Sequence, residues 1–342
     1  MTSEQIKEYG LGLGFCKVGI APVESLTGYC DEVLSRGEAY ELFLKRLTKP
    51  VWETMPNAKS VIVLAWDYFQ HDFPQALQEM IGKLYLSREY NPPQGSLSQE
   101  KLALMREYLE ANGFSQDTAP LHVPQRWAAV QAGVATIGRN TFAYTGDSGS
   151  YVILYAIVVD QELAYDQPTP ENNCPPNCRA CMDACPTKAL YAPFKLDPTK
   201  CIPFHNFVRQ DGRGAVSSFI PYEYRTAIGS KIHGCDICQD VCPRNQKKRK
   251  QPKQMDPYME KIASAISLPA ILAMSDEYYH ETIWPIMYNY IHDKRYFMRN
   301  AALAMGNRKD EADVEHLTEA LHNPDAMVRE YVVWALEQVR DE

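Results

Sequence analysis

Apolar residues in the first 160 positions follow two patterns, helical spacing and short continuous runs. The helical spacing predicts three helices, over residues 2–13, 99–112 and 125–132. The apolar runs predict three buried strands, over residues 16–21, 60–66 and 151–160. We expect the last and longest run at the centre of its sheet. Helices interleaved with strands predict a mixed α/β domain over residues 1–160.

From about residue 256 the pattern is helical throughout, with a weak internal repeat. Each copy has an arginine at its third position, Arg299 and Arg329, and an aspartate shortly before it, Asp293 and Asp325. A helical pair with an arginine near the start of its second helix resembles a HEAT-type repeat, and two copies make a short appendage. We expect an all-α, HEAT-like domain over residues 254–342, which either covers the middle of the chain or binds a partner.

A cysteine-rich segment, residues 161–253, lies between these two parts and opens with a proline-containing stretch of little regular structure. Its eight cysteines are Cys174, Cys178, Cys181, Cys185, Cys201, Cys235, Cys238 and Cys242. Each of the two blocks ends in a cysteine followed by proline, at Pro186 and Pro243. Three closely spaced cysteines and a fourth before proline form the run of ferredoxins with two 4Fe–4S clusters, where the fourth ligates the other cluster. We expect a ferredoxin-like domain that holds two such clusters, because eight thiolates are what they require.

Zinc is the main alternative, since Cys-x2-Cys pairs also suit a tetrahedral zinc ion. Zinc ribbons, however, usually pair two such knuckles, and neither block stops at a knuckle. Disulfides fit less well, because the opening MTSEQIKEYG has neither the basic region nor the apolar region of a secretory signal. No apolar window approaches the length of a membrane span. These features predict a soluble, cytoplasmic electron-transfer protein.

The formal charge of −8 is unevenly distributed over the 342 residues. Residues 254–342 carry 16 acidic and 8 basic side chains, so the remainder of the chain is balanced. A basic run from Arg244 to Lys253 stands at the boundary. It is either a solvated loop or a patch that contacts phosphates, as in nucleic-acid binding. The overall acidity disfavours a general nucleic-acid binder.

Three signatures occur in order along the chain. The first is Asp-Thr-Ala-Pro-Leu at 117–121, followed by Ala-Gly at 132–133 and Ile-Gly-Arg-Asn-Thr at 137–141. The second is the cysteine block with Cys201 sixteen residues after Cys185, and the third is the stretch 228–243 with the helical tail. Together they resemble the epoxyqueuosine reductases, cobalamin-dependent iron–sulfur enzymes that finish the queuosine modification of tRNA. Their mechanistic relatives are the reductive dehalogenases.

This resemblance implies an α/β corrinoid-binding domain of the reductive-dehalogenase type, followed by the cluster domain and the tail. It also implies two ligand sets. The first cluster would be held by Cys174, Cys178, Cys181 and Cys242. The second would be held by Cys185, Cys201, Cys235 and Cys238. Cys16 and Cys30 are left over, and we expect both to be ordinary packed thiols.

In that family an epoxide oxygen is removed from a cyclopentane ring, which gives an alkene and water. Electrons pass through the clusters to the corrinoid, and a protein acid gives a proton to the departing oxygen. Asp117 matches this acid, and the alternative is a turn residue before Pro120. The candidate corrinoid contacts are Gly138, Arg139, Asn140 and Thr141, which otherwise form a simple helix-to-strand connection.

The implied partners are a tRNA anticodon stem-loop that carries epoxyqueuosine and an external electron donor such as flavodoxin or ferredoxin. No membrane partner is implied, and we expect a monomer. Three interpretations of the function stay open. The chain could be an epoxyqueuosine reductase, a reductase of the same architecture with another substrate, or a two-cluster electron carrier. Asp117 and the α/β domain favour an enzyme over a carrier, because a carrier needs only the cluster domain.

Several positions depart from the family pattern. Three residues instead of two separate Cys174 from Cys178, and the segment between Asp117 and Ala132 is longer. Tyr90-Asn91 stands where a Tyr-His pair is usual, and the glutamate expected soon after the Asp-x-x-Pro turn is missing. The cluster-binding part is therefore kept, while the part that faces the substrate has diverged.

Overall fold

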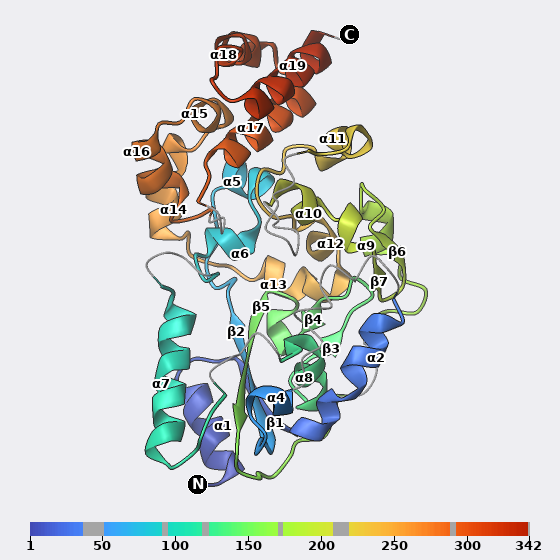
Figure 1. The fold of residues 1–342 in the computed structure, drawn as a ribbon, viewed down its shortest axis with the longest axis vertical. Helices are drawn as coiled ribbons and strands as arrows, with labels where there is room; N and C mark the ends of the chain where they lie inside the picture. The colour runs from blue at the N-terminus through green and yellow to red at the C-terminus, as the bar shows by residue number, and fades with distance from the viewer. Residues whose placement is uncertain are drawn as a thin grey trace.

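The structure is a computed structural model that describes residues 1–36, 51–90, 95–117, 123–169, 174–207, 219–287 and 292–340. Figure 1 shows an elongated molecule with the N-terminal sheet at one end and the C-terminal helices at the other. The cysteine-rich segment lies between them. The order of the parts in space therefore follows their order in the sequence.

A three-stranded antiparallel sheet forms the N-terminal part, with β2 (Ser60–Asp67) between β1 (Lys17–Pro22) and β5 (Val152–Val159). The expectation that the run 151–160 would be the central strand is wrong. Its strand β5 pairs with β2 on one side and has only an isolated bridge, Gln116 to Val159, on the other among the described residues. A long apolar run indicates that both faces of a strand are covered. It does not indicate whether the strand pairs with neighbours along both of its edges.

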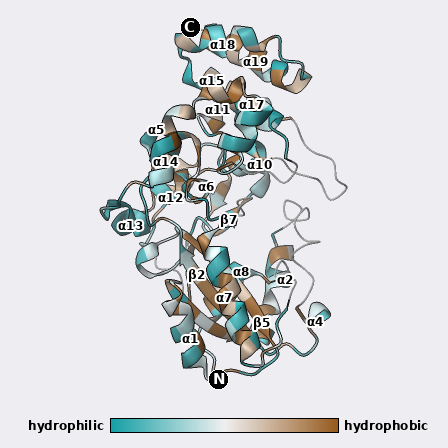
Figure 2. Cartoon of the chain, turned by 90° about the vertical axis from the view of Figure 1, so that its left-hand side faces the viewer, coloured by the Kyte–Doolittle hydropathy of each residue, from teal (hydrophilic) through white to brown (hydrophobic). Residues whose placement is uncertain are grey.

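Side chains of β2 alternate between two cores, as the two-residue period of a strand requires. Ile62 and Leu64 pack with α1 (Ser3–Gly12) and α7 (Leu97–Ala111). Val61 and Val63 pack on the opposite face with α8 (Gln125–Gln131). These three helices confirm the predicted ones, with ends shifted by no more than two residues. Figure 2 shows the resulting apolar strands beneath the polar outer faces of the helices.

The remaining elements of the first 160 residues are short. They are η1 (Val23–Leu26), α2 (Gly28–Leu34), α4 (Val51–Thr54), α5 (Gln75–Met80), α6 (Lys83–Leu86), β3 (Thr136–Ile137), β4 (Ala143–Tyr144) and η4 (Gly146–Ser148). Helices α5 and α6 leave the sheet and pair with the cysteine-rich segment. The Ile232 N–H donates to Met80 O at 2.9 Å, and the Gly82 N–H donates to His233 O at 2.8 Å.

Within residues 161–169, 174–207 and 219–253, the cysteine-rich segment forms short helices and one hairpin. They are α9 (Ala180–Ala184), β6 (Leu190–Ala192), β7 (Lys195–Leu196), η5 (Pro198–Lys200), α10 (Ile202–Asn206), α11 (Tyr222–Ile228), α12 (Ile237–Asp240), η6 (Pro243–Asn245) and α13 (Gln246–Lys250). The stretch 161–169 has no helix or strand, as predicted, and runs beside β1. There the Asp166 N–H donates to Ile20 O at 2.9 Å.

The described tail is helical, as predicted. Its elements are α14 (Pro257–Ile262), η7 (Ala263–Ala265), α15 (Leu268–Leu272), α16 (Asp276–Tyr278), η8 (Tyr279–Ile283), α17 (Arg295–Arg308), η9 (Glu311–Asp313), α18 (Val314–Ala320) and α19 (Ala326–Arg340). The HEAT-like character of this tail stays a prediction. Its two repeat arginines differ in environment, because Arg299 is fully buried and donates to His205 O, whereas Arg329 donates to the Asn323 and Pro324 carbonyls.

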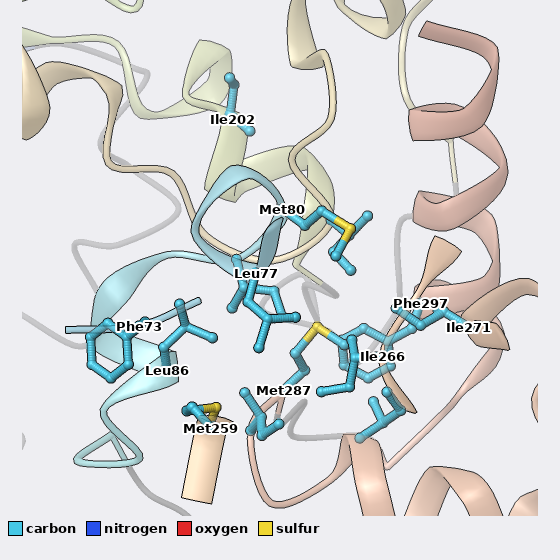
Figure 3. Close-up of a cluster of buried hydrophobic side chains, with 14 of the residues drawn as sticks. Phe73, Leu77, Met80, Leu86, Ile202, Met259, Ile266, Ile271, Met287 and Phe297 are labelled. Carbon is cyan, nitrogen blue, oxygen red and sulfur yellow. The ribbon is translucent and has the colours of Figure 1, made fainter. Parts of the chain in front are cut away.

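One apolar core joins the three parts of the chain. Figure 3 shows Leu77 and Met80 of α5 near Met287 and Phe297 of the tail, with Ile202 of the cysteine-rich segment above them. The helices α5 and α6 thus tie the N-terminal sheet to the rest of the molecule. None of the helices in the described ranges has the length and apolarity needed to span a bilayer.

Candidate iron–sulfur and catalytic site

The four cysteines assigned to the first cluster line one small cavity. They are Cys174, Cys178, Cys181 and Cys242. Other walls come from residues 139, 140 and 144, so the N-terminal part of the chain closes the cavity. The fold thereby brings Cys242 to a group of thiols that lie more than sixty residues earlier in the sequence.

The cysteines assigned to the second cluster form a neighbouring group. Burial raises the pKa of the Cys238 thiol well above its usual value, and the neighbouring Cys235 and Cys201 add to the increase. Burial also raises the pKa of Cys235 to about 11, with a further contribution from Cys185. These thiols are therefore neutral until a metal replaces their protons, as is general for cysteine ligands.

Short helices and prolines set the positions of these thiols. Cys181 lies on α9 and Cys238 on α12, and the two helices pack against each other. Cys185 and Cys242 each follow one of these helices and have extended backbones, with ψ of 111° and 124°. A residue before proline avoids the helical conformation, so Pro186 and Pro243 end the helical backbone at the two cysteines expected to cross over.

Residues 138–141, the candidate corrinoid contacts, lie directly on the first group of cysteines. The Arg139 N–H donates to Cys174 Sγ at 3.4 Å, and the Arg139 guanidinium donates to Cys178 O at 2.6 Å. Asn140 Nδ2 donates to Cys238 O at 3.2 Å. Arg139 Nε is buried and has no hydrogen-bond partner within the part of the chain that the structure describes. The loop is thus more than a connection between a helix and a strand, because it touches both groups of cysteines.

Asp117, the candidate acid, is 6% exposed and lies beside the end of β5. Its N–H donates to Val158 O at 3.0 Å, and its Oδ2 lies 3.0 Å from the hydroxyl oxygen of Thr54. It lines neither of the two cavities described in this section. On α8, Arg126 donates to Thr141 O of the loop at 2.8 Å. The turn after Asp117 falls on residues 118–122, outside the described ranges.

The basic run 244–253 is engaged only in part with the rest of the molecule, because Lys247, Arg249 and Lys250 are exposed. Lys248 forms a buried ion pair with Asp67 at 2.5 Å, and Arg249 donates to Asp240 O. Lys247 pairs with Asp147 at 2.7 Å on the surface. The run therefore anchors α13 to the sheet, which neither of the two sequence interpretations included.

An open groove of about 490 Å³ lies next to the first group of cysteines. Its walls include Lys17, Arg244 and Lys247, together with Tyr144, which also lines the cysteine cavity. The groove therefore has a positive rim, although Asp147 lowers its charge.

A buried lysine that the sequence did not single out supports the second group of cysteines. Lys83 is 3% exposed, and its ammonium lies 2.8 Å from Asp240 Oδ1. Its backbone N–H donates to Oδ2 of Asp236 at 2.7 Å, next to Cys235. No sequence signal marks Lys83, because its partners lie more than 150 residues away.

The remaining expectations concern the two left-over cysteines and the positions that depart from the family pattern. Cys16 is exposed, with its thiol donating to Ala65 O at 3.2 Å, so the expectation of a packed thiol is wrong there. The strand begins one residue later than predicted and leaves Cys16 at the surface. The side chain of Cys30, as well as Asn91 and His122, lies outside what the structure describes. Tyr90 packs edge-on against Tyr85.

A family model described as a 4Fe–4S double cluster binding domain matches residues 174–245. This match confirms iron–sulfur clusters over zinc for the cysteine blocks.

Curated relatives along most of the chain are epoxyqueuosine reductases. The Bacillus subtilis protein is 28% identical over 355 residues, which cover 99% of this chain and 88% of the relative. The Xanthomonas campestris protein is 30% identical over 301 residues, which cover 84% of this chain and 80% of the relative.

Solved structures give the same result. A crystal structure of epoxyqueuosine reductase with an epoxyqueuosine-modified tRNA-Tyr stem loop is 26% identical, with a TM-score of 0.80, and the match covers 99% of this chain and 90% of that one. A Bacillus subtilis epoxyqueuosine reductase, solved with the catalytic loop that carries an aspartate swung out of the active site, has a TM-score of 0.81 at 26% identity. That match covers 98% of this chain and 90% of the other.

Proposed function

The chain belongs to the epoxyqueuosine reductase family, and we propose that it reduces epoxyqueuosine to queuosine in tRNA. The observation that carries this proposal is the double-cluster segment, placed against an N-terminal loop in a chain that is similar to these reductases along nearly its whole length. An electron carrier would not need the N-terminal part.

We assign the first cluster to Cys174, Cys178, Cys181 and Cys242, because they line one cavity. We assign the second to Cys185, Cys201, Cys235 and Cys238, whose thiols interact with one another. The chain fits a cluster at the first site in a further way, since the Arg139 N–H already points at a ligand sulfur. Backbone N–H groups of this kind stabilise the negative charge of a cluster.

We also assign a cobalamin to the enzyme, which when bound supplies low-potential cobalt for reduction of the epoxide. Residues 138–141 are the proposed contacts. The buried Arg139 Nε supports this assignment, because an acceptor on a bound group would give this donor the partner it lacks in the described structure. Arg126 holds the loop from behind through Thr141 O.

Asp117 is the proposed acid that gives a proton to the departing epoxide oxygen. The Thr54 hydroxyl donates to Asp117 Oδ2 at 3.0 Å, and the Asp117 N–H donates to Val158 O at 3.0 Å. These two contacts hold the carboxyl in a defined position beside the end of β5, as an acid that protonates one particular oxygen requires.

The location, the partners and the oligomeric state are part of the same proposal. A tRNA substrate is consistent with a cytoplasmic location, and the proposed partner is an anticodon stem-loop that carries epoxyqueuosine. A flavodoxin or ferredoxin is the proposed electron donor, and the proposed state is a monomer with a HEAT-like tail.

One observation favours a second candidate, a reductase of the same architecture that acts on another substrate. Part of the basic run is engaged by Asp67, Asp147 and the Asp240 carbonyl, and the segment 254–342 has twice as many acidic as basic residues. The surface is therefore less suited to RNA phosphates than the run alone indicates.

Complementation of a bacterial strain that lacks its own reductase tests the proposal. We expect mass spectrometry of its tRNA nucleosides to show queuosine in place of epoxyqueuosine. The Asp117→Asn variant should leave epoxyqueuosine unconverted while it keeps its full iron content. If wild-type protein with both clusters leaves epoxyqueuosine unchanged, the substrate assignment is wrong and the second candidate gains support.

A further inference from the structure

Tyr144 ends the short strand β4 and reaches a ligand of the proposed first cluster. Its side chain lines the cysteine cavity and is 4% exposed. Its hydroxyl lies 3.1 Å from Cys242 Sγ, across 98 residues of sequence. The contact is therefore a product of the fold, between the N-terminal part and the last cysteine of the second block.

The direction of this hydrogen bond follows from Asn140. Its amide nitrogen donates to Cys238 O at 3.2 Å, and a carbonyl oxygen can only accept, so the amide orientation is fixed. The same nitrogen lies 3.0 Å from the Tyr144 oxygen, which it supplies with a hydrogen bond. The single proton of Tyr144 then has two acceptors within reach, Cys242 Sγ and, at 3.2 Å, Asn140 Oδ1. A cluster-bound thiolate carries more negative charge than an amide oxygen and takes the proton.

A cation strengthens the Tyr144 donor. The Arg244 guanidinium carbon lies 4.0 Å from the centre of the Tyr144 ring. A positive charge over the ring face withdraws electron density from the phenol and makes its O–H a better donor. Asn140 also touches Cys238, a proposed ligand of the other cluster, so the Asn140–Tyr144 pair joins ligand residues of both clusters.

We propose that Tyr144 is a positioning residue that raises the reduction potential of the first cluster through its hydrogen bond to Cys242. Reduction adds negative charge to the cluster and its sulfurs, so a donor to a ligand sulfur stabilises the reduced form more than the oxidised form. This inference rests on the proposed cluster ligands and is independent of the substrate that the enzyme reduces.

Potentiometric titration followed by EPR tests the proposal on anaerobically reconstituted holoenzyme. In Tyr144→Phe we expect the reduced-to-oxidised ratio of one cluster to fall about tenfold at a fixed potential, or about 59 mV for a one-electron couple. The other cluster should keep its potential. Tyr155→Phe is the matched control, because Tyr155 is a half-buried tyrosine whose hydroxyl bonds to Ser98 at 2.7 Å. Its midpoints should equal those of the wild type.

Two outcomes overturn the proposal when Tyr144→Phe keeps its full iron content: unchanged midpoints for both clusters, or equal shifts of both. A total near four irons in the wild type would instead refute the two-cluster assignment, whatever Tyr144 does. If Tyr144→Phe loses iron, the proposal is tested instead on wild-type protein that carries tyrosine labelled with 17O at the hydroxyl. Pulsed EPR of its reduced clusters should show a 17O coupling on one cluster, and its absence on both overturns the proposal.

Discussion

The Thr54 hydroxyl lies 3.0 Å from Oδ2 of Asp117, although 63 residues separate them in the sequence. The same hydroxyl lies 2.9 Å from Val51 O, in the preceding turn of α4. Val51 O also accepts from the Met55 N–H at 2.9 Å, so the Thr54 proton can be donated to Asp117. A threonine that no motif includes thus completes the site of the proposed acid.

Replacement of Thr54 by valine should slow proton delivery. Valine keeps the shape of the side chain but removes the hydroxyl that holds the Asp117 carboxyl in position, so we expect a single-turnover rate about tenfold lower, corresponding to about 1.4 kcal/mol. Thr318→Val is the control, because that hydroxyl donates to Val314 O on the exposed helix α18, away from the site. Equal rates for Thr54→Val and wild type would show that Thr54 does not assist the acid.

The iron content should separate the eight cluster cysteines from the ninth described one. We expect reconstituted wild type to bind about eight irons per chain, as two 4Fe–4S clusters require. Cys16→Ala should keep this value, because Cys16 is exposed and its thiol donates to Ala65 O rather than lying with the other cysteines. Cys238→Ala should lower it towards about four. A Cys16→Ala protein that loses iron would contradict the ligand assignment.

An ion pair in the tail should make the start of α19 sensitive to acid. Partial burial alone would raise the pKa of Asp325, but the N–H groups of Val328 and Met327 and the Arg295 guanidinium outweigh burial and lower this pKa. A lowered folded-state pKa gives stability above the unfolded value of about 3.9 that is lost as the pH falls through the folded-state pKa.

Asp325→Asn isolates this charge, since asparagine keeps the ability to cap a helix. We expect hydrogen exchange of the α19 amides to be about twofold to fivefold faster than wild type at pH 7, as for a partly exposed pair. At pH 3 the two proteins should exchange alike. Asp276→Asn, which removes an exposed pair with Lys294, is the control and should not change α19. A difference that persists undiminished at pH 3 would exclude the charge as its cause.

Helices α17 and α19 approach closely at Gly306. A β-carbon there would lie 2.7 Å from Ala335 Cα and 2.9 Å from the Trp334 ring. Gly306→Ala should therefore destabilise the protein by about 1–3 kcal/mol through overpacking, seen as a lower midpoint in calorimetry. Gly12→Ala is the matched control, because nothing lies within 4 Å of the added carbon in helix α1. A Gly306→Ala protein as stable as Gly12→Ala would show that the two helices separate without cost.

Local patterns predicted the elements well but not their neighbours. The helices of the first 160 residues lie within two residues of the predicted ranges, because capping and apolar spacing act over a few positions. The edge position of β5 and the exposure of Cys16 could not be read in this way. Both depend on which segments cover a strand, and the covering segments come from elsewhere in the chain.

The basic run shows the same limit for charged residues. Its composition indicated either a solvated loop or a phosphate contact, and Lys248 instead pairs with Asp67, 181 residues away. A charge pattern reports how many cations are close in sequence. It does not report which anions the fold brings to them, and those anions decide whether the cations remain available to a ligand.

The number and spacing of the cysteines predicted two 4Fe–4S clusters, because most of the ligands come from two short stretches of the chain, and the match to a double-cluster family model confirms them. The surroundings of those thiols came from folding. Tyr144 reaches Cys242, and Thr54 reaches Asp117, across 98 and 63 residues. Such contacts require the sheet, the loop 138–141 and the cysteine helices to pack at one place, and no local pattern specifies that packing.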